Sequence, residues 1–297
     1  MMENFKEVLK ERTGETEQIV YAYMPQETGY QKDVIEAMNY SLTAGGKRLR
    51  PMLVMETARL FGFEDEEVRP FMAAIEMIHT YSLVHDDLPA MDNDEFRRGK
   101  LTTHKKYGHA MGILAGDGLL NYAYEVCAKA IITSGHKDRA AEAFHILADK
   151  AGIYGMVGGQ TVDVQYTDKP MEKEVLQFVH ELKTGALIQA AMMMGAVLAG
   201  ASEEEVGKIE EAALMVGMAF QIQDDILDVT STTEVLGKPV LSDEKNHKVT
   251  YVTLYGLEEA KRQVKEYSDR AVELLEGLNR KNEFLHELLM SLIYREK

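Results

Sequence analysis

The chain has 297 residues, 45% of them hydrophobic, which is enough to bury a large core in one big domain or two small ones. Its net charge of −16, from 49 acidic and 33 basic residues, argues against nucleic acid or an anionic membrane surface as a partner. The longest apolar stretch, 186–201, is short for a membrane span, the single cysteine excludes an intrachain disulfide, and residues 1–15 lack a signal-peptide core, so we expect a cytoplasmic protein.

Apolar residues recur at helical spacing along most of the chain, whereas the alternation typical of strands is nearly absent. The spacing predicts helices over 32–43, 51–61, 68–87, 116–134, 137–151, 173–182, 186–199, 203–228, 257–278 and 284–294. No linker rich in Ser, Pro or Gly divides the chain, and no short repeat is visible. The pattern therefore predicts one all-α domain over residues 1–297.

The first distinctive segment is the loop 43–51, with the sequence TAGGKRLRP. Its two glycines free the backbone, and Pro51 suits the first position of a helix. Lys47 and Arg50 can therefore cluster beside a helix N-terminus, which favours anions. Taken alone, this segment could equally be an ordinary loop.

An acidic cluster, HDDLPAMD at 85–92, ends the predicted helix 68–87. Helical geometry places Asp86 above Ser82 and His79, a histidine that could equally be a core residue. Asp92 lies about 120° away from Asp86 on a regular helix, so the two can share a metal group only if the helix ends or bulges between them. Pro89 is placed to end it.

A second acidic cluster, QDDILD at 223–228, ends the predicted helix 203–228. Asp224 and Asp228 lie on one face, one turn apart, above a stripe of apolar or small residues that includes Gly217. Crowded carboxylates repel one another and lose hydration, so two such clusters on facing helices predict bound cations. Magnesium takes oxygen ligands and leaves positions for substrate phosphates, which indicates an enzyme acting on a diphosphate.

Basic residues accompany these clusters in an otherwise acidic chain. They are Arg97, Arg98, Lys183 (followed by Thr184), Lys238 and Lys248. An arginine pair can bind phosphate oxygens in bidentate fashion, although Arg97 and Arg98 could simply balance the neighbouring acids. Each segment has such an ordinary interpretation by itself. Their joint occurrence in one all-α chain is hard to explain as a set of unrelated surface charges.

With these motifs the chain resembles the short-chain trans-prenyl diphosphate synthases, and most closely the bacterial farnesyl diphosphate synthases. The resemblance runs from about residue 44 to residue 251. The resemblance rests on four motifs: DDLPAMD with the following RRG, DDILD, GGKRLRP and the GKP at 237–239. In one departure, the KVTY at 248–251 is followed by Val252 where the family has proline.

The resemblance implies a bundle of roughly ten or more antiparallel helices around a deep central cavity, usually as a homodimer. It implies that Asp86 and Asp92 hold two Mg²⁺ ions and Asp224 a third, with Asp87, Asp225 and Asp228 as further candidates. It also implies the residues of two diphosphate sites. Arg97, Lys183 and Lys238 bind the allylic diphosphate, and Gly46, Lys47, Arg50, His79, Arg98 and Lys248 complete the substrate-binding set.

The implied reaction condenses isopentenyl diphosphate with dimethylallyl or geranyl diphosphate through an allylic cation, which Thr184, Gln221 and the carbonyl of Lys183 stabilise. No side-chain nucleophile is needed. Ser82 and Tyr81, four and five residues before Asp86, help set the pocket floor in the family. Helix geometry puts Ser82 below Asp86 and Tyr81 to one side, so spacing alone does not show that Tyr81 blocks the cavity; the resemblance implies that it does, giving farnesyl diphosphate.

Four other functions compete with this interpretation. A geranylgeranyl diphosphate synthase would share the chemistry but have a deeper pocket, against which Tyr81 argues. A class I terpene cyclase usually carries an Asn/Ser/Glu pattern at its second metal site and needs no second diphosphate site. A non-catalytic synthase subunit would be expected to lack intact acidic clusters. A helical scaffold would not bind magnesium diphosphate.

Overall fold

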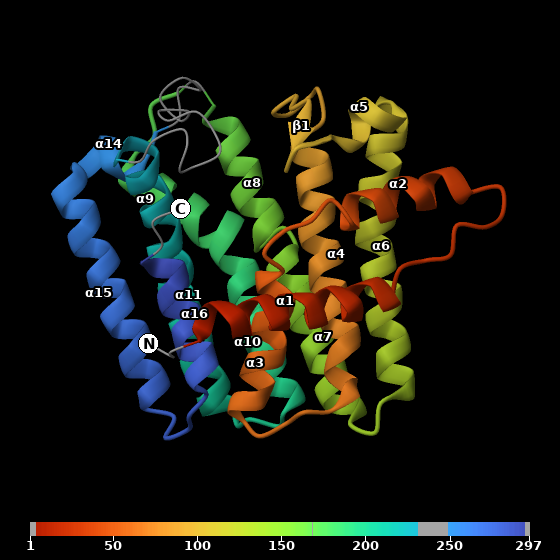
Figure 1. Cartoon of the computed structure of the whole chain (residues 1–297). Helices are drawn as coiled ribbons and strands as arrows, with labels where there is room; N and C mark the ends of the chain where they lie inside the picture. The colour runs from red at the N-terminus through yellow and green to blue at the C-terminus, as the bar shows by residue number, and fades with distance from the viewer. Residues whose placement is uncertain (1–3, 168, 231–248, 295–297) are drawn as a thin grey trace.

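The computed structural model describes residues 4–167, 169–230 and 249–294, which fold almost entirely as helices (Figure 1). The helices of the N-terminal half are α1 (Phe5–Ala22), α2 (Lys32–Leu42), α3 (Leu49–Leu60), η1 (Glu66–Val68), α4 (Arg69–Asp86), α5 (Thr103–Tyr107), α6 (His109–Thr133) and α7 (Lys137–Ala151). The remaining helices are α8 (Met156–Gln165), α9 (Lys173–Val179), the π-helical turn η2 (His180–Gly185), α10 (Ala186–Leu198), α11 (Glu203–Thr230), α14 (Tyr251–Tyr255), α15 (Leu257–Glu276) and α16 (Glu283–Ile293). The all-α prediction is confirmed.

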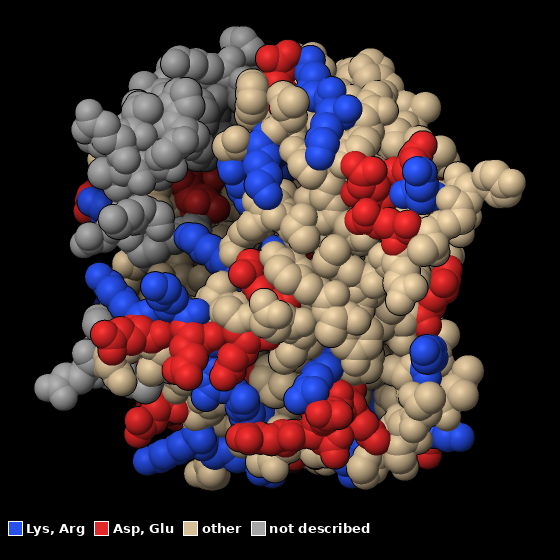
Figure 2. Space-filling view, turned by 45° about the vertical axis from the view of Figure 1, so that its right-hand side comes forward, with Lys and Arg blue, Asp and Glu red and all other residues tan. Residues whose placement is uncertain are grey.

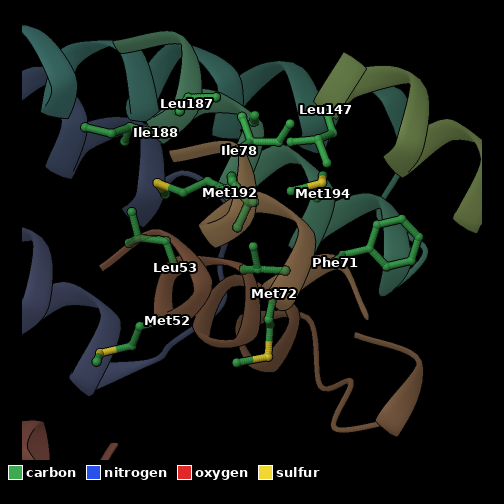
Figure 3. Close-up of a cluster of buried hydrophobic side chains, with 14 of the residues drawn as sticks. Met52, Leu53, Phe71, Met72, Ile78, Leu147, Leu187, Ile188, Met192 and Met194 are labelled. Carbon is green, nitrogen blue, oxygen red and sulfur yellow. The ribbon is translucent and has the colours of Figure 1, made fainter. Parts of the chain in front are cut away.

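Helix α10 forms the centre of the core. Every residue of α10 is buried, and the helix packs against α3, α7 and α11. Met192 and Met194 lie among Leu53, Ile78 and Leu147 in the cluster drawn in Figure 3. The methionine run 192–194 is therefore core packing, as its place in an apolar helix indicates.

Two helix pairs flank this centre, α4 with α6 and α11 with α15. Figure 1 shows these long helices standing roughly parallel, with α1 crossing in front of α4. The C-terminal end of α4 leads into a short hairpin, in which β1 (Phe96–Arg97) pairs antiparallel with β2 (Lys100–Leu101). No helix in the described part of the chain is both long and apolar enough to cross a membrane.

Several elements differ from the sequence prediction. Helix α1 and helix α8 were not predicted, and α6 begins at His109 instead of 116. Helix α8 contains Gly158, Gly159 and three valines, which have low helix propensity, and the start of α6 is also rich in glycine. Tertiary packing overrides these local preferences, because α8 packs against η2 and α9, and α6 against α4.

Candidate active site

The first acidic cluster lies where α4 ends. The last residue of α4 is Asp86, and Asp87 follows as its C-cap. The chain then turns back, because the backbone N–H of Asp92 donates to the carbonyl of Asp86 at 2.9 Å. The predicted end of the helix between Asp86 and Asp92 is therefore confirmed, and Pro89 lies within the turn.

Asp87 is held by the hairpin. Its carboxylate is 3% exposed and accepts from Nη2 of Arg97 at 2.6 Å and from Nε at 2.9 Å. Burial raises the pKa of Asp87, and the arginine opposes that shift. This bidentate pair fixes the hairpin and holds the Arg97 guanidinium beside the acidic cluster.

Asp86 is joined to α8. Nε2 of Gln160 donates to Oδ1 of Asp86 at 2.8 Å, and the other amide atom of Gln160, Oε1, is buried without a partner. Burial raises the pKa of Asp86 to about 6; Lys183 opposes the shift and Asp92 adds to it. The carboxylate is thus in a position where a nearby cation stabilises its charged form.

Lys183 comes to the site from the π-helical turn η2. Its Nζ lies 2.6 Å from Oδ2 of Asp163, one turn after Gln160 on α8. Gly159 allows the close approach, because a Cβ there would lie 2.3 Å from the backbone nitrogen of Lys183. The sequence prediction assigned no role to Gln160 or Asp163, whose contacts with Asp86 and Lys183 form only in the folded chain. A π-helical turn inside a longer helix is often functional, and this one displaces Lys183 and Thr184 from regular helical register.

The second acidic cluster lies inside a continuous helix, since α11 runs on to Thr230. Asp225 and Asp228 are buried, and Asp224 is partly exposed. The backbone N–H of Tyr251 donates to Oδ2 of Asp225 at 2.6 Å. Earlier on α11, Oε1 of Gln221 accepts from the Thr184 hydroxyl at 2.9 Å, which joins this helix to η2.

The basic loop 43–51 has a positive φ at three of the four residues from Gly45 to Arg48. Gly45 and Gly46 have φ of 90° and 139°, and Arg48 has φ of 49°. The Arg48 side chain turns inward and is 2% exposed, with Nη1 2.7 Å from Oε1 of Glu76 on α4. Arg48, which the sequence prediction did not use, therefore anchors the loop, while Lys47 stays exposed.

Arg50, His79 and Arg98 form a second positive group. Burial lowers the pKa of Arg50 to about 10, and its Nε has no partner. Burial also lowers the pKa of His79, and the charges of Arg50 and Arg98 lower it further. Arg98 donates to the carbonyl of Gly45, so the hairpin and the loop 43–51 meet here. Two arginines at this point, one of them with a buried Nε that has no partner, suit an anionic ligand.

Two cavities meet at these residues. A polar cavity of about 760 Å³ is lined by residues that include Asp92, Arg97 and Asp225, so both acidic clusters contribute to it. An apolar cavity of about 510 Å³ is lined by residues that include Arg50, Tyr81 and Ser82. The two share Met91, Gln160, Val164, Lys183 and Thr184. The predicted arrangement of apolar walls beneath an acidic mouth is thus present.

The carboxylates of the two acidic clusters offer oxygen ligands of the kind that magnesium takes. Within the described residues, no group of three or more His, Cys, Asp or Glu side chains stands close enough to hold a metal ion alone. The available ligands are nevertheless carboxylate oxygens, and the charges of Asp92 and Asp87 raise the pKa of Asp86. These residues fit Mg²⁺ with phosphate oxygens completing its ligand shell. Lys238 and Lys248 lie outside the described residues.

Charge elsewhere is mixed. Figure 2 shows acidic and basic side chains next to one another over the face it presents. Ion pairs also join charged side chains of different helices, such as Arg270 with Glu211, whose Nη2 and Oε1 are 2.8 Å apart. The net charge of −16 is therefore compatible with cationic groups gathered at the cavities.

Comparison with known proteins identifies relatives over most of the chain. The polyprenyl synthetase family profile matches residues 31–286. Farnesyl diphosphate synthase of Geobacillus stearothermophilus is 46% identical over 76% of each chain, and a chloroplastic geranylgeranyl pyrophosphate synthase of Capsicum annuum is 45% identical over 82% of this chain and 66% of its own. A geranyltransferase of Helicobacter pylori, solved with magnesium and isoprenyl diphosphate, has a TM-score of 0.82 and 31% identity over 99% of this chain and 97% of its own.

Proposed function

The chain belongs to the polyprenyl synthetase family, and from that premise we propose that it is a prenyltransferase. The reaction joins isopentenyl diphosphate to dimethylallyl and then geranyl diphosphate, and the product is farnesyl diphosphate. The observation that carries this proposal is the junction of the polar and apolar cavities at Lys183 and Thr184. An allylic diphosphate has the same two parts, a charged head and a hydrocarbon tail.

Asp86, Asp92 and Asp224 would hold three Mg²⁺ ions, which stabilise the charge that develops on the leaving diphosphate. Arg97 and Lys183 bind the same diphosphate. Both cations are already aimed at the polar cavity by carboxylate partners, Asp87 and Asp163. Because these pairs fix the two side chains before substrate arrives, little ordering is left for binding.

The isopentenyl diphosphate belongs in the positive group formed by Lys47, Arg50, His79 and Arg98. The loop 43–51, the hairpin and α4 supply these residues. The buried, unpaired Nε of Arg50 supports the assignment, because an anion would satisfy it. We also propose that Lys238 binds the allylic diphosphate and that Lys248 contributes to substrate binding; both lie outside the described residues.

In the reaction, the allylic C–O bond breaks and its electron pair leaves with the diphosphate. The isopentenyl double bond then forms the new C–C bond with the allylic cation, and loss of one proton to the released diphosphate creates the new double bond. Thr184 lines both cavities and its hydroxyl donates to Oε1 of Gln221, and we propose that the oxygen atoms of these two side chains stabilise the allylic cation. The apolar wall excludes water, which would otherwise capture the cation.

Tyr81 is proposed to end chain growth at fifteen carbons. Its ring lines the apolar cavity and is 6% exposed, and Ser82 lines the same cavity. Each added isoprene unit would gain burial of about 0.8 kcal/mol per methylene, so growth needs a physical stop. The relatives include geranylgeranyl diphosphate synthases, and a twenty-carbon product is the second candidate.

The proposal extends to assembly and location. We propose a single domain over residues 1–297, because one apolar cluster joins α1 to α16. A homodimer is supported by large apolar side chains that lie exposed on α6 and before α8, such as Ile113, Leu114 and Tyr154. Sedimentation would test the dimer. A cytoplasmic location agrees with the lone, buried cysteine.

The deciding experiment is product analysis by chain length. The purified protein is incubated with labelled isopentenyl diphosphate and dimethylallyl diphosphate, with and without magnesium. A magnesium-dependent fifteen-carbon diphosphate supports the whole proposal, and a twenty-carbon product keeps the chemistry but refutes the Tyr81 stop. Absence of any condensation by the folded protein would overturn the proposal.

A further inference from the structure

A second ring besides Tyr81 lines the apolar cavity. His85 follows Tyr81 by one turn on α4, and both residues line the cavity. Their rings are 5.8 Å apart and cross at 80°, an edge-to-face contact. The position of Tyr81 at the floor therefore depends on where the imidazole of His85 is held.

The neighbouring helix α6 holds that imidazole in a notch. Nε2 of His85 donates to the carbonyl oxygen of Ile113 at 3.1 Å, and Oδ1 of Asp117 lies 3.7 Å away. Between these residues in sequence is Gly116. A Cβ there would lie 2.1 Å from Nε2 and 2.3 Å from Cδ2 of His85, so the imidazole occupies the space that any other residue would fill.

We propose that the notch at Gly116 and the imidazole seated in it set the position of Tyr81, and thereby the length of the product. His85 and Gly116 act here as positioning residues for chain length. The inference rests on the proposed prenyltransferase function and goes beyond it, because it places a determinant of length on α6. Since α4 and α6 pack tightly, an imidazole expelled from the notch can move only toward the cavity that it already lines.

The test is a double-variant cycle with product length as its readout. Gly116→Ala should raise the ten-carbon to fifteen-carbon ratio and lower kcat/KM for geranyl diphosphate roughly tenfold, as expected when about one methylene of pocket is lost. The kcat/KM for dimethylallyl diphosphate should change much less. His85→Ala should shift the product toward twenty carbons, and adding Gly116→Ala to it should change the ratio no further.

Gly118→Ala is the matched control on α6. Its new methyl group would meet the flexible end of Met38, with Sδ at 2.8 Å, so the product ratio should stay that of the unsubstituted protein. Thermal unfolding of each variant separates a local change from loss of fold.

An unchanged ratio in Gly116→Ala would overturn the inference, as would a shift that persists when His85 is already alanine. If His85→Ala is inactive, the geranyl-to-dimethylallyl selectivity of Gly116→Ala decides by itself. Failure of the proposed function would be distinguishable, because the unsubstituted protein would then form no prenyl diphosphate at all.

Discussion

The two cavities that meet at Lys183 and Thr184 are built on different physical principles. Two ion pairs, Arg97 with Asp87 and Lys183 with Asp163, organise the polar cavity. A hydrogen bond from the Gln160 amide to Asp86 adds to them. Apolar and aromatic packing shapes the other cavity, where Tyr81 rests on His85. Electrostatic pairs are directional and couple strongly to a diphosphate, whereas packing fixes volume and shape. The rate of reaction and the length of product should therefore respond to different residues.

The largest effect should come from the acidic cluster at the end of α4. Asp86→Asn removes a carboxylate where the two cavities meet, and turnover should fall on the order of 10²–10³-fold, the loss typical of a removed transition-state charge partner. Product length among the remaining turnovers should not change, which chromatography of labelled products measures. Asp94→Asn is the matched control, because Asp94 lines the polar cavity close by but is largely exposed. Equal losses in the two variants would contradict the assignment.

A smaller effect is expected when the ion-pair partner of Lys183, Asp163, is changed. Asp163→Asn leaves Lys183 without the carboxylate that aims it, and misplacement by about 1 Å can cost up to 10²-fold. We expect kcat/KM for the allylic diphosphate to fall roughly tenfold. The KM for isopentenyl diphosphate should be unchanged in the same steady-state assay, and Glu210→Gln, which removes the partner of Lys150 elsewhere, should change neither. Loss at both substrates would mean that α8 had moved as a whole.

A substitution in the apolar cavity should change the length of the product more than the rate of reaction. Tyr81→Ala removes the ring at the floor, so products longer than fifteen carbons should appear while total turnover stays within a few-fold. Ser82→Ala loses only a hydroxyl that donates to the carbonyl of His79, so its effect on product length should be much smaller than that of Tyr81→Ala. Gas chromatography of the dephosphorylated products makes the measurement. An unchanged profile in Tyr81→Ala would show that another residue ends growth.

The smallest effect concerns the buried histidine behind the site. Burial lowers the pKa of His180 to about 4. The unfolded chain therefore binds more protons between about pH 6.5 and pH 4, and stability falls as pH drops through that window. His180→Gln should lose this part of the acid sensitivity, while the stability of both proteins changes in parallel above about pH 7. Urea unfolding at a series of pH values gives the comparison, and identical pH slopes would contradict it.

Much of the fold follows from local spacing. Helix α7 has the predicted bounds, and α2, α3, α4 and α10 lie within two residues of theirs at each end. Both acidic clusters were recognised, together with the turn between Asp86 and Asp92, because carboxylate spacing and a proline are local features. The roles of these residues in metal and substrate binding stay predictions.

Tertiary structure alone decided the rest. Glycine-containing α8 forms although its helix propensity is low, since packing supplies the stability that local preference lacks. Arg48 turns inward and Lys183 pairs with a residue of another helix, which no local pattern contains. The notch at Gly116 exists only because α4 meets α6 there. A sequence specifies which side chains share one face of a helix, but which faces meet, and how closely, depends on how the helices pack together.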